Sequence, residues 1–419
     1  MWIDSQKQAF LVPKEKLEKF AILRESILAK KSVSLKVLQR FMGKCISFML
    51  AVPGARLYIS DICIALSEHY RSGSFSIVIT GTLKDEVIFC RFIDNWDGFL
   101  PWKLEKHKVV KLTTDSSNYK WAGKFETNDI SLEFGDYWHA DVLDSHIIVK
   151  EARAIILSLK SVKNYIPDSR IDILCDCKSF IDAWNGQGSK SPEVTVVLKE
   201  LFILVRDLRI YLNFCFVTSE QNPVDDLSRS FSKEDTMLSN IAWERVQQLR
   251  TGNCHTLDLM ALDSNAMVAR DGKQIKHFTP YATPHSAGIN MFAQDIDPAE
   301  ICYVFPPFKC IEAVLAFILQ QNLSCTLIVP DFPVKQSWWP NLVYSSSLCV
   351  TLGVKGDKDI LLYPSKKGYI RDKKGLPWNL LVFHIYPTRL SKCICYEPPC
   401  SFTAFESYYW RFDCTGIKR

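Results

Sequence analysis

KLTTDSSNYKWAG, residues 111–123, is the stretch of this chain that most strongly indicates its fold. An apolar run, VVKL, leads into it, and Asp115 follows two threonines at the end of that run. Residues 116–118 have the composition of a tight turn, and Trp121 lies on a second short strand-like run. An aspartate after a strand is usually a turn residue. Asp115 alone is therefore a weak indication of a functional site, and three further carboxylates downstream strengthen it.

Those carboxylates occur in a fixed order of predicted elements. Glu151 lies in the first turns of HIIVKEARAIILSLKSV, whose apolar residues recur at helical spacing. An acid on the apolar side of a helix is unusual without a partner. Asp176 ends the apolar run RIDILCD, and Asp225 lies in TSEQNPVDDLSRSF, after the run RIYLNFCFV. Two predicted helices, CKSFIDAWN and VTVVLKELFILVRDL, separate these last two strands.

This order of three strands, a helix, a strand, helices and a strand resembles the RNase H domains of retroelements. TTDSSNYKWAG, HIIVKEARAI, ILCDCKSF and NPVDDLSR each resemble one acidic motif of that family, and together they cover residues 107–231. The resemblance implies an α/β fold, an RNase H-like mixed five-stranded sheet with helices. In that fold the first and fourth strands are central neighbours. Asp115 and Asp176 would then be adjacent, with Glu151 reaching over from the first helix.

The resemblance also implies a metal centre. Asp115, Glu151, Asp176 and Asp225 would hold two Mg²⁺ ions, with Mn²⁺ as an alternative, and Asp226 replaces Asp225 if the register shifts by one. Such ions take oxygen ligands and activate water for phosphodiester cleavage. They also relieve the repulsion between clustered carboxylates. The implied partner is an RNA–DNA hybrid, contacted through its backbone and 2′-hydroxyls.

The first hundred residues are predicted to be helical and basic. Amphipathic runs cover residues 13–50, and a third helix is expected over 55–70. Basic residues crowd its first 44 positions, among them Lys14, Lys16, Lys19, Lys30, Lys31, Lys36, Arg40 and Lys44. Lysine-rich helices can face a phosphate backbone, but they are equally typical of the solvated face of a small bundle.

LQRFMGKCISFMLAVPGARLY resembles the thumb and connection of reverse transcriptases, above all those of DIRS/Ngaro-like retrotransposons. The resemblance covers residues 8–105. Polymerase chemistry in that family needs a Tyr-x-Asp-Asp tetrad, and the only adjacent aspartates here follow Val224 instead. We therefore expect no polymerase activity, and a palm on a separate chain is a candidate partner.

Residues 233–419 alternate strand-like and helical runs, an α/β pattern. LDLMALDSNA and VFPPF resemble the phage-type Dam adenine methyltransferases, which implies a second, methyltransferase-like domain. The resemblance places Asp258 and Asn265 near adenosylmethionine, and Pro306 and Pro307 in the catalytic loop. Phe305 stands where that family has a polar acceptor for the adenine amine. We therefore do not expect adenosylmethionine to be a cofactor, and predict a degenerate module that binds nucleic acid or a partner.

Composition sets the remaining limits. The chain has 419 residues, 47% of them hydrophobic, and a net charge of +5, which is consistent with two or three packed domains. It has no apolar run of membrane-spanning length, and its N-terminus does not resemble a secretory signal. We therefore expect an intracellular protein, in the cytoplasm or nucleus, with its 15 cysteines reduced.

These observations predict a thumb and connection remnant over residues 1–105, an RNase H-like domain over 106–232 and the degenerate domain over 233–419. The predicted function is hydrolysis of the RNA strand of RNA–DNA hybrids, as part of a reverse transcriptase that lacks its palm. Two alternatives stay open: a catalytically inactive nucleic-acid-binding remnant, and an adenine DNA methyltransferase.

Overall fold

The computed structural model describes residues 2–386 except 7, 53, 74, 95, 97–99, 102–107 and 251–253. The expected boundary near residue 105 and the segment after residue 386 lie outside these ranges. The chain divides into two compact units. The first comprises Met1–Gly135 and Asp144–Ser228, and the second comprises Asp136–Leu143 and Arg229–Arg419.

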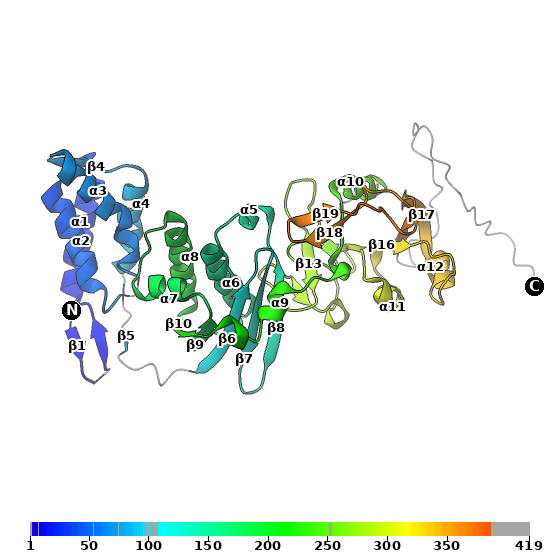
Figure 1. Ribbon diagram of the computed structural model, residues 1–419, viewed down its shortest axis with the longest axis horizontal. Coiled ribbons are helices and arrows are strands. Elements are labelled where there is room, and N and C mark those ends of the chain that lie inside the picture. The colour runs from blue at the N-terminus through cyan, green and yellow to red at the C-terminus, as the bar shows by residue number, and fades with distance from the viewer. Residues whose placement is uncertain are drawn as a thin grey trace, which may run out of the picture. The chain divides into compact units, whose positions relative to one another are not determined.

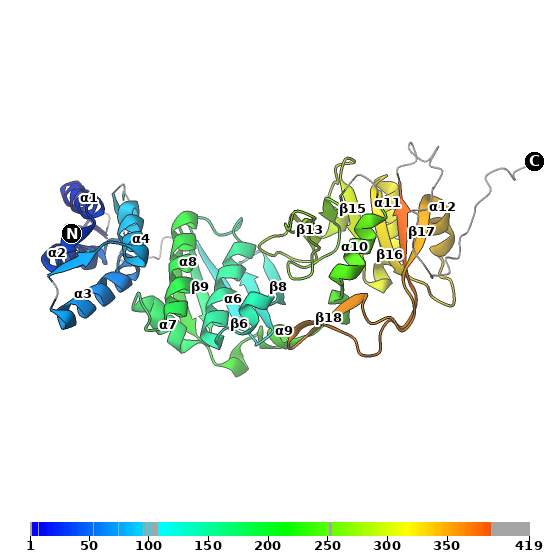
Figure 2. The same ribbon diagram turned by 90° about the horizontal axis from the view of Figure 1, so that it is seen from above.

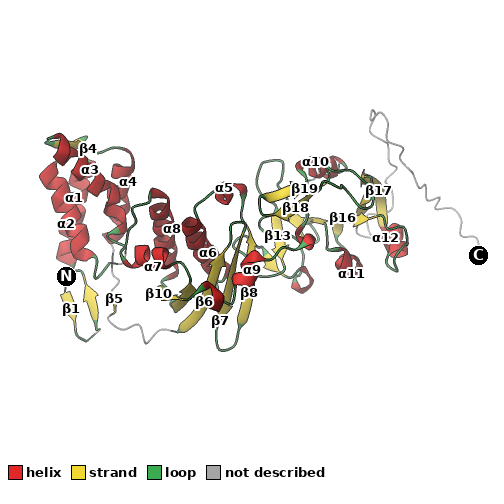
Figure 3. Ribbon diagram, viewed as in Figure 1, coloured by secondary structure: helices red, strands yellow, loops and turns green. Residues whose placement is uncertain are grey.

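The N-terminal part of the first unit is a small helical layer with short strands (Figure 3). Its elements are β1 (Trp2–Asp4), β2 (Ala9–Leu11), α1 (Lys14–Leu28), β3 (Ser32–Ser34), α2 (Leu35–Phe48), α3 (Ser60–Ser72), β4 (Ser76–Val78), α4 (Gly81–Phe89) and β5 (Leu100–Pro101). Phe20 of α1 packs against Phe41 and Phe48 of α2, with ring centroids 5.0 and 5.4 Å away. The predicted helices are confirmed, except that α3 begins at Ser60, after a 3-10 turn over Leu57–Ile59.

This helical layer packs directly on α8 (Pro192–Leu208) of the sheet domain that follows. The buried Glu86 carboxylate accepts from the ammonium of Lys199 at 2.9 Å, and the Tyr58 hydroxyl donates to the Lys199 carbonyl at 3.2 Å. Gly54 also lies against the ring of Phe202, so closely that a Cβ there would come within 2.3 Å of it. These contacts explain why the helical layer and the sheet form one unit.

The sheet of the first unit has five strands in the order β10-β9-β6-β7-β8 (Figure 1). They are β6 (Val109–Ser116), β7 (Lys120–Glu126), β8 (Ser131–Tyr137), β9 (Arg170–Cys175) and β10 (Tyr211–Phe216). β6 runs antiparallel to β7 and parallel to β9, and β9 is parallel to β10. This confirms the predicted RNase H-like mixed sheet, in which the first and fourth strands are central neighbours.

The helices of this domain are α6 (Ile147–Ser161), α7 (Lys178–Asn185), α8 and the short α9 (Asp225–Arg229). The predicted helix start is confirmed, because the side chain of His146 caps α6 by accepting from the Ile148 amide at 3.3 Å. α6 packs on β6, β7 and α8, with Ala152, Ile155 and Leu159 fully buried. Glycine at 123 allows this approach, because a Cβ would lie 2.5 Å from the Ser158 hydroxyl.

The second unit is built on a seven-stranded sheet in the order β14-β13-β12-β15-β16-β20-β17. Figure 2 labels β13, β15, β16 and β17 of this sheet. Its strands and helices are α5 (Ala140–Leu143), β11 (Met237–Leu238), α10 (Asn240–Gln248), β12 (Leu257–Asp258), β13 (Lys276–Thr279), β14 (Gly288–Ile289), β15 (Ile301–Val304), α11 (Ile311–Gln320), β16 (Ser324–Pro330), α12 (Trp339–Ser345), β17 (Ser346–Gly353), β18 (Leu361–Ser365), β19 (Gly368–Arg371) and β20 (Leu380–Ile385). The five strands from β14 to β16 are parallel, and β20 is antiparallel to both of its neighbours.

Helices cover both faces of this sheet. Along β16, Leu327 and Val329 join the apolar cluster that includes α11, whereas Ile328 joins the cluster that includes α10. Successive side chains of a strand point to opposite faces, so the two clusters lie on opposite sides of the sheet. The predicted α/β character of this region is confirmed. Within the described ranges, no helix is both long and apolar enough to cross a membrane.

Candidate active site

The register of the central strands brings two of the predicted acids together. β6 and β9 run parallel, with Thr113 opposite Leu174. Continued two residues beyond this last pair, the same register leads to Asp115 near the end of β6 and to Asp176, which directly follows β9. The sequence prediction of adjacent first and third acids therefore agrees with the strand pairing.

Glu151 reaches this point from α6. Its side chain is only 5% exposed, and its Oε1 accepts a hydrogen bond from the Ser116 hydroxyl at 2.8 Å. Its Oε2 is buried and has no hydrogen-bond partner. Possible ligand atoms of Glu151, Cys175 and Asp176 lie within 4.8 Å of one another. In the described part of the chain this group does not extend to the carboxylates of Asp115 or Asp225.

The electrostatics join Asp115 to the same cluster. Burial, together with the negative charges of Asp115 and Asp176, raises the pKa of Glu151 to about 8, although the hydrogen bond from Ser116 opposes the shift. Buried carboxylates that repel one another in this way are typical of sites that hold a cation. Three of the four predicted acids therefore share one electrostatic environment.

The fourth acidic motif is connected to the first acid through its neighbours. Asn222 donates to Oδ1 of Asp115 at 3.2 Å and to the Thr114 carbonyl at 3.1 Å. The Ser228 hydroxyl donates to Oδ2 of Asp115 and lies 2.9 Å from the Asp225 carbonyl. Asp225 itself begins α9 and is half-buried, whereas Asp226 is exposed. The lower exposure of Asp225 favours it over Asp226 as the fourth acid of the site.

Several polar residues that support the acids were not identified from the sequence. Ser116 holds Glu151, Asn222 and Ser228 hold Asp115, and the Ser219 hydroxyl donates to Oδ2 of Asp176 at 2.7 Å. Asn222 and Ser228 stand inside the quoted motif NPVDDLSR, so only their roles were missed. Ser116 and Ser219 carry no signal that separates them from ordinary turn serines.

Lys150 is a further residue that sequence reasoning missed. It directly precedes Glu151, is almost fully buried, and its ammonium donates to the Asn118 carbonyl at 2.9 Å. Burial lowers its pKa, and Asp144 opposes that shift. This contact ties the first turns of α6 to the turn between β6 and β7, and it therefore helps to fix Glu151 next to the end of β6.

The donor set fits Mg²⁺ better than a softer metal. Carboxylate oxygens are the ligands that this ion prefers. Burial raises the pKa of the Cys175 thiol, so this group stays protonated at neutral pH and is not available as a thiolate ligand. The unpartnered Oε2 of Glu151 is a buried acceptor that a cation would satisfy.

The residues predicted to lie near adenosylmethionine have structural partners. Asp258 ends β12, is buried, and accepts from the Met260 amide at 3.1 Å; burial raises its pKa to about 7. The Asn265 side chain accepts from the Leu262 backbone amide through Oδ1 at 2.7 Å and donates through Nδ2 to the Asp235 carbonyl at 3.2 Å. Pro306 and Pro307 follow β15, the neighbour of β12, so all of these residues stand near the carboxyl edge of the sheet.

The sequence and the fold were compared with those of known proteins. No family model matches the sequence, and no curated protein matches it. Two similar solved structures are LC11-RNase H1 in complex with RNA/DNA hybrid and RNase H1 from the halophilic archaeon Halobacterium salinarum NRC-1. They are 13% and 16% identical, each covers 28% of this chain, and 91% and 92% of their own chains are matched, both with a TM-score of 0.25.

A third is the foamy viral protease-reverse transcriptase in complex with dsDNA, which is 14% identical. It covers 48% of this chain and 41% of its own, with a TM-score of 0.22. The assignment of the RNase H-like fold rests on the strand order and register described above, and not on these similarities.

Proposed function

We propose that the first unit hydrolyses the RNA strand of RNA–DNA hybrids, with Asp115, Glu151, Asp176 and Asp225 as the metal ligands. The observation that carries this proposal is the buried Glu151 carboxylate, whose Oε2 has no partner and whose pKa is raised by burial and by two neighbouring acids. A buried, unpaired carboxylate is costly unless the group is protonated or meets a positive charge. A cation site explains both features together.

In this reaction the acidic residues would hold the metal ions, and neighbouring polar residues orient the acids. Two Mg²⁺ ions, when bound, supply an activated water and stabilise the leaving oxygen. Ser116 orients Glu151, and Ser219 orients Asp176. Asn222 and Ser228 fix both oxygens of Asp115. With the acids held in this way, the expected products carry 3′-hydroxyl and 5′-phosphate ends.

The helical layer supports a role in holding the nucleic acid. Burial lowers the pKa of Lys44 of α2, and so do the charges of Arg40, Lys19 and Lys16. Basic residues of α1 and α2 therefore converge on one region, which suits a phosphate backbone. The helical layer is proposed as a remnant of a reverse-transcriptase thumb and connection from a DIRS/Ngaro-like element. The boundaries at residues 105 and 232, and a place in the cytoplasm or nucleus, stay predictions.

Cleavage of an RNA–DNA hybrid labelled in its RNA strand, with Mg²⁺ present, tests the proposal. We expect the wild type to cut and Asp176→Asn to lose at least about 100-fold in rate, as expected when a residue that stabilises the transition state is removed. Asp172→Asn is the matched control, because Asp172 lies on β9, which directly precedes Asp176, but pairs with Arg170 and Asn213. Hybrid binding without cutting by the wild type would favour the inactive remnant instead.

A second candidate function concerns the second unit. An open sheet with five parallel strands, and an antiparallel strand inserted before the last one, is the arrangement of adenosylmethionine-dependent methyltransferases, and it supports the resemblance noted in the sequence. Phe305 still lacks the acceptor that methyl transfer to adenine needs. Calorimetry with adenosylmethionine tests this candidate: binding that is lost in Asp258→Ala supports a methyltransferase, and absence of binding leaves a degenerate fold.

A further inference from the structure

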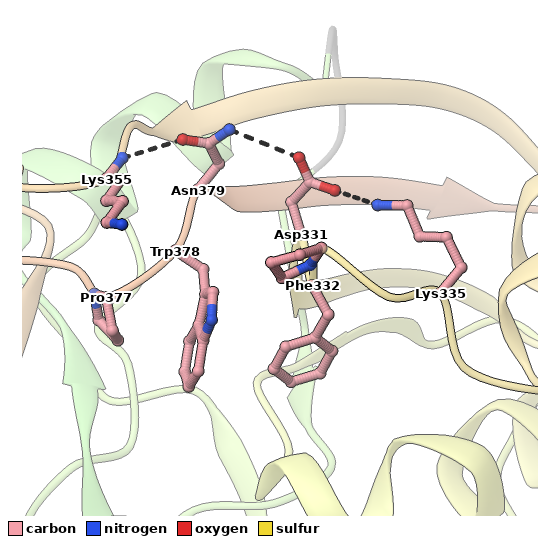
Figure 4. A pocket seen from close by; sticks show the side chains of 8 residues that line it. Asp331, Phe332, Lys335, Lys355, Pro377, Trp378 and Asn379 are labelled. Carbon is pink, nitrogen blue, oxygen red and sulfur yellow. Dashed lines mark hydrogen bonds and ion pairs between the residues drawn. The ribbon is translucent and has the colours of Figure 1, made fainter.

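A cavity of about 460 Å³ opens in the second unit beside the end of β16 (Figure 4). One wall is the segment that directly follows β16, and the other is the segment that directly precedes β20. The two strands are antiparallel, with Pro330 opposite Leu380, and the Asp331 amide donates to the Asn379 carbonyl at 2.8 Å. The residues that line the cavity are Asp331, Phe332, Pro333, Lys335, Lys355, Pro377, Trp378 and Asn379.

The position and size of this cavity are compatible with a small-molecule site. In open α/β sheets, ligands bind outside the carboxyl ends of the parallel strands, and β16 is such a strand. Its volume lies within the range of roughly 300–1,000 Å³ that is usual for small-molecule sites. The strand pairing fixes both walls, so the cavity is largely pre-formed.

Aromatic rings form the apolar part of the wall. The rings of Phe332 and Trp378 lie 5.1 Å apart at 76°, and Phe308 contacts both at 5.9 and 5.8 Å. Phe308 comes from the loop after β15 and is 39% exposed. In Figure 4 the rings of Phe332 and Trp378 extend to the same side of their segments. Half-exposed rings of this kind are platforms on which a planar ligand can stack.

The polar part of the wall is a fixed carboxylate flanked by ammonium groups. The Asp331 carboxylate pairs with Lys335, and the Asn379 amide donates to it at 3.4 Å. Asn379 is itself held by the backbone amide of Lys355 at 2.9 Å. Among the described residues no carboxylate pairs with the Lys355 ammonium. The cavity therefore offers an oriented acceptor and a nearby positive charge.

We propose that this cavity binds a single nucleotide. The base stacks on the face of Trp378 and meets the ring of Phe332, which lies at 76° to it, edge-on. Its exocyclic amino group donates to Asp331, and the phosphate lies against Lys355. Cytosine, adenine and guanine carry that amino group, whereas thymine and uracil do not. The same chemistry is offered by a free mononucleotide and by an unstacked base of a single strand. This site is separate from hybrid hydrolysis and does not require it.

Photocrosslinking of the full chain tests the proposal directly. A short oligo(dC) that contains 5-iododeoxycytidine is irradiated with the protein, and the crosslinked peptide is identified by mass spectrometry. We expect the crosslink within residues 331–335 or 377–379. Because the basic helices of the first unit also attract DNA, the position of the crosslink is decisive rather than the total affinity. A crosslink confined to other segments would overturn the proposal.

Variants make the test quantitative, with crosslink yield at this site measured over a range of DNA concentrations. Trp378→Ala should weaken binding about 5- to 150-fold, the effect of removing one base–aromatic stack. Tyr344→Ala is the control, because Tyr344 is 93% exposed and does not line the cavity. If Trp378→Ala fails to fold, Lys355→Glu gives the same test from the surface of the site. Unchanged binding in folded Trp378→Ala and in Lys355→Glu would refute the proposal.

Competition then identifies the base preference and the source of the nucleotide. Wild-type crosslinking should be displaced more strongly by oligo(dC) than by oligo(dT), and Asp331→Asn should reduce that difference. Displacement by dCMP at the same nucleotide concentration as oligo(dC) indicates a free nucleotide, whereas displacement by the oligonucleotide alone indicates a single strand. Equal displacement by oligo(dC) and oligo(dT) in the wild type would contradict the contact assigned to Asp331.

Discussion

The hydroxyl of Ser228 donates a hydrogen bond to the carboxylate of Asp115, across 113 residues of sequence. Asn222 holds the other oxygen of the same carboxylate at 3.2 Å. The last acidic motif of the domain therefore positions the first acid, in addition to supplying Asp225. This arrangement makes Asn222, in the loop before α9, and Ser228, in α9 itself, part of the site.

Ser228→Ala should reduce hybrid cleavage and destabilise the first unit. The substitution removes a hydrogen bond to a charged group, which contributes about 1.5–3 kcal/mol, and it leaves Asp115 less restrained. Rates of cleavage and urea unfolding measure both effects. Ser47→Ala is the control, because the exposed Ser47 bonds only to the Lys44 carbonyl of its own helix. Full activity in Ser228→Ala would show that this hydrogen bond does not position the acid.

Gly123→Ala should destabilise the first unit by about 1–3 kcal/mol, as overpacking of a core does. A Cβ at this position would lie 2.4 Å from the ring of Phe134 and 2.5 Å from the Ser158 hydroxyl, so α6 or β8 must shift. Gly188→Ala is the matched control, because nothing lies within 4 Å of a Cβ there. Thermal unfolding compares the two variants, and equal melting temperatures would contradict close packing of α6 on β7.

The RNase H-like sheet could be predicted because its pattern is local. Apolar runs end at Asp115 and Asp176, helical spacing surrounds Glu151, and turn residues separate the elements. The parallel pairing of β6 with β9 follows from the order of the elements once the fold is recognised. The start of α3 was predicted five residues too early, because the mostly apolar residues after Gly54 include a 3-10 turn over Leu57–Ile59 that packs against α8.

The hydrogen bonds that position the acidic side chains could not be predicted in the same way. The bonds from Ser228 to Asp115 and from Ser219 to Asp176 join segments that are distant in sequence, and serine is common in every loop. The cavity of the second unit depends on the pairing of β16 with β20, which brings Phe332 and Trp378 to 5.1 Å. Neither residue belongs to a recognisable motif. Long-range pairing, and not local propensity, creates both features.

The stability of the second unit should depend on the ionisation of Asp136. Burial, together with the charge of Asp263, raises the pKa of this carboxyl to about 7. The folded state then binds a proton that the unfolded state has already lost, so stability falls as the pH rises from about 4 to about 7. Urea unfolding from pH 5 to pH 8 measures this fall.

Asp136→Asn should remove that part of the pH dependence, although it also alters the bonds to Ser264. The control is Asp141→Asn, because Asp141 belongs to the same segment but is exposed. The difference in unfolding free energy between wild type and Asp136→Asn should change with pH by a few kcal/mol. A difference that stays constant between pH 5 and pH 8 would show that Asp136 remains ionised in the folded protein.

Mg²⁺ should stabilise the wild type, and chelation should reverse the effect. The buried Glu151 carboxylate has an unpartnered oxygen, and burial and two acidic neighbours raise its pKa to about 8, so the metal-free folded state favours its protonated form at neutral pH. A ligand that binds only the folded state at 100 times its Kd adds about 2.7 kcal/mol. Because Mg²⁺ needs the ionised carboxylate, this stabilisation should increase as the pH rises from 6 to 8.

Glu151→Gln separates the metal site from general charge effects. The variant keeps the shape of the side chain and a group that can interact with Ser116, but it carries no charge. It should therefore be at least as stable as the wild type in EDTA at pH 8, and it should gain little from Mg²⁺. Glu133→Gln, at an exposed position on β8, should keep the full response to Mg²⁺. Equal stabilisation of Glu151→Gln and the wild type by Mg²⁺ would mean that the ion binds elsewhere, and Glu151 would then be a buried acid without a metal.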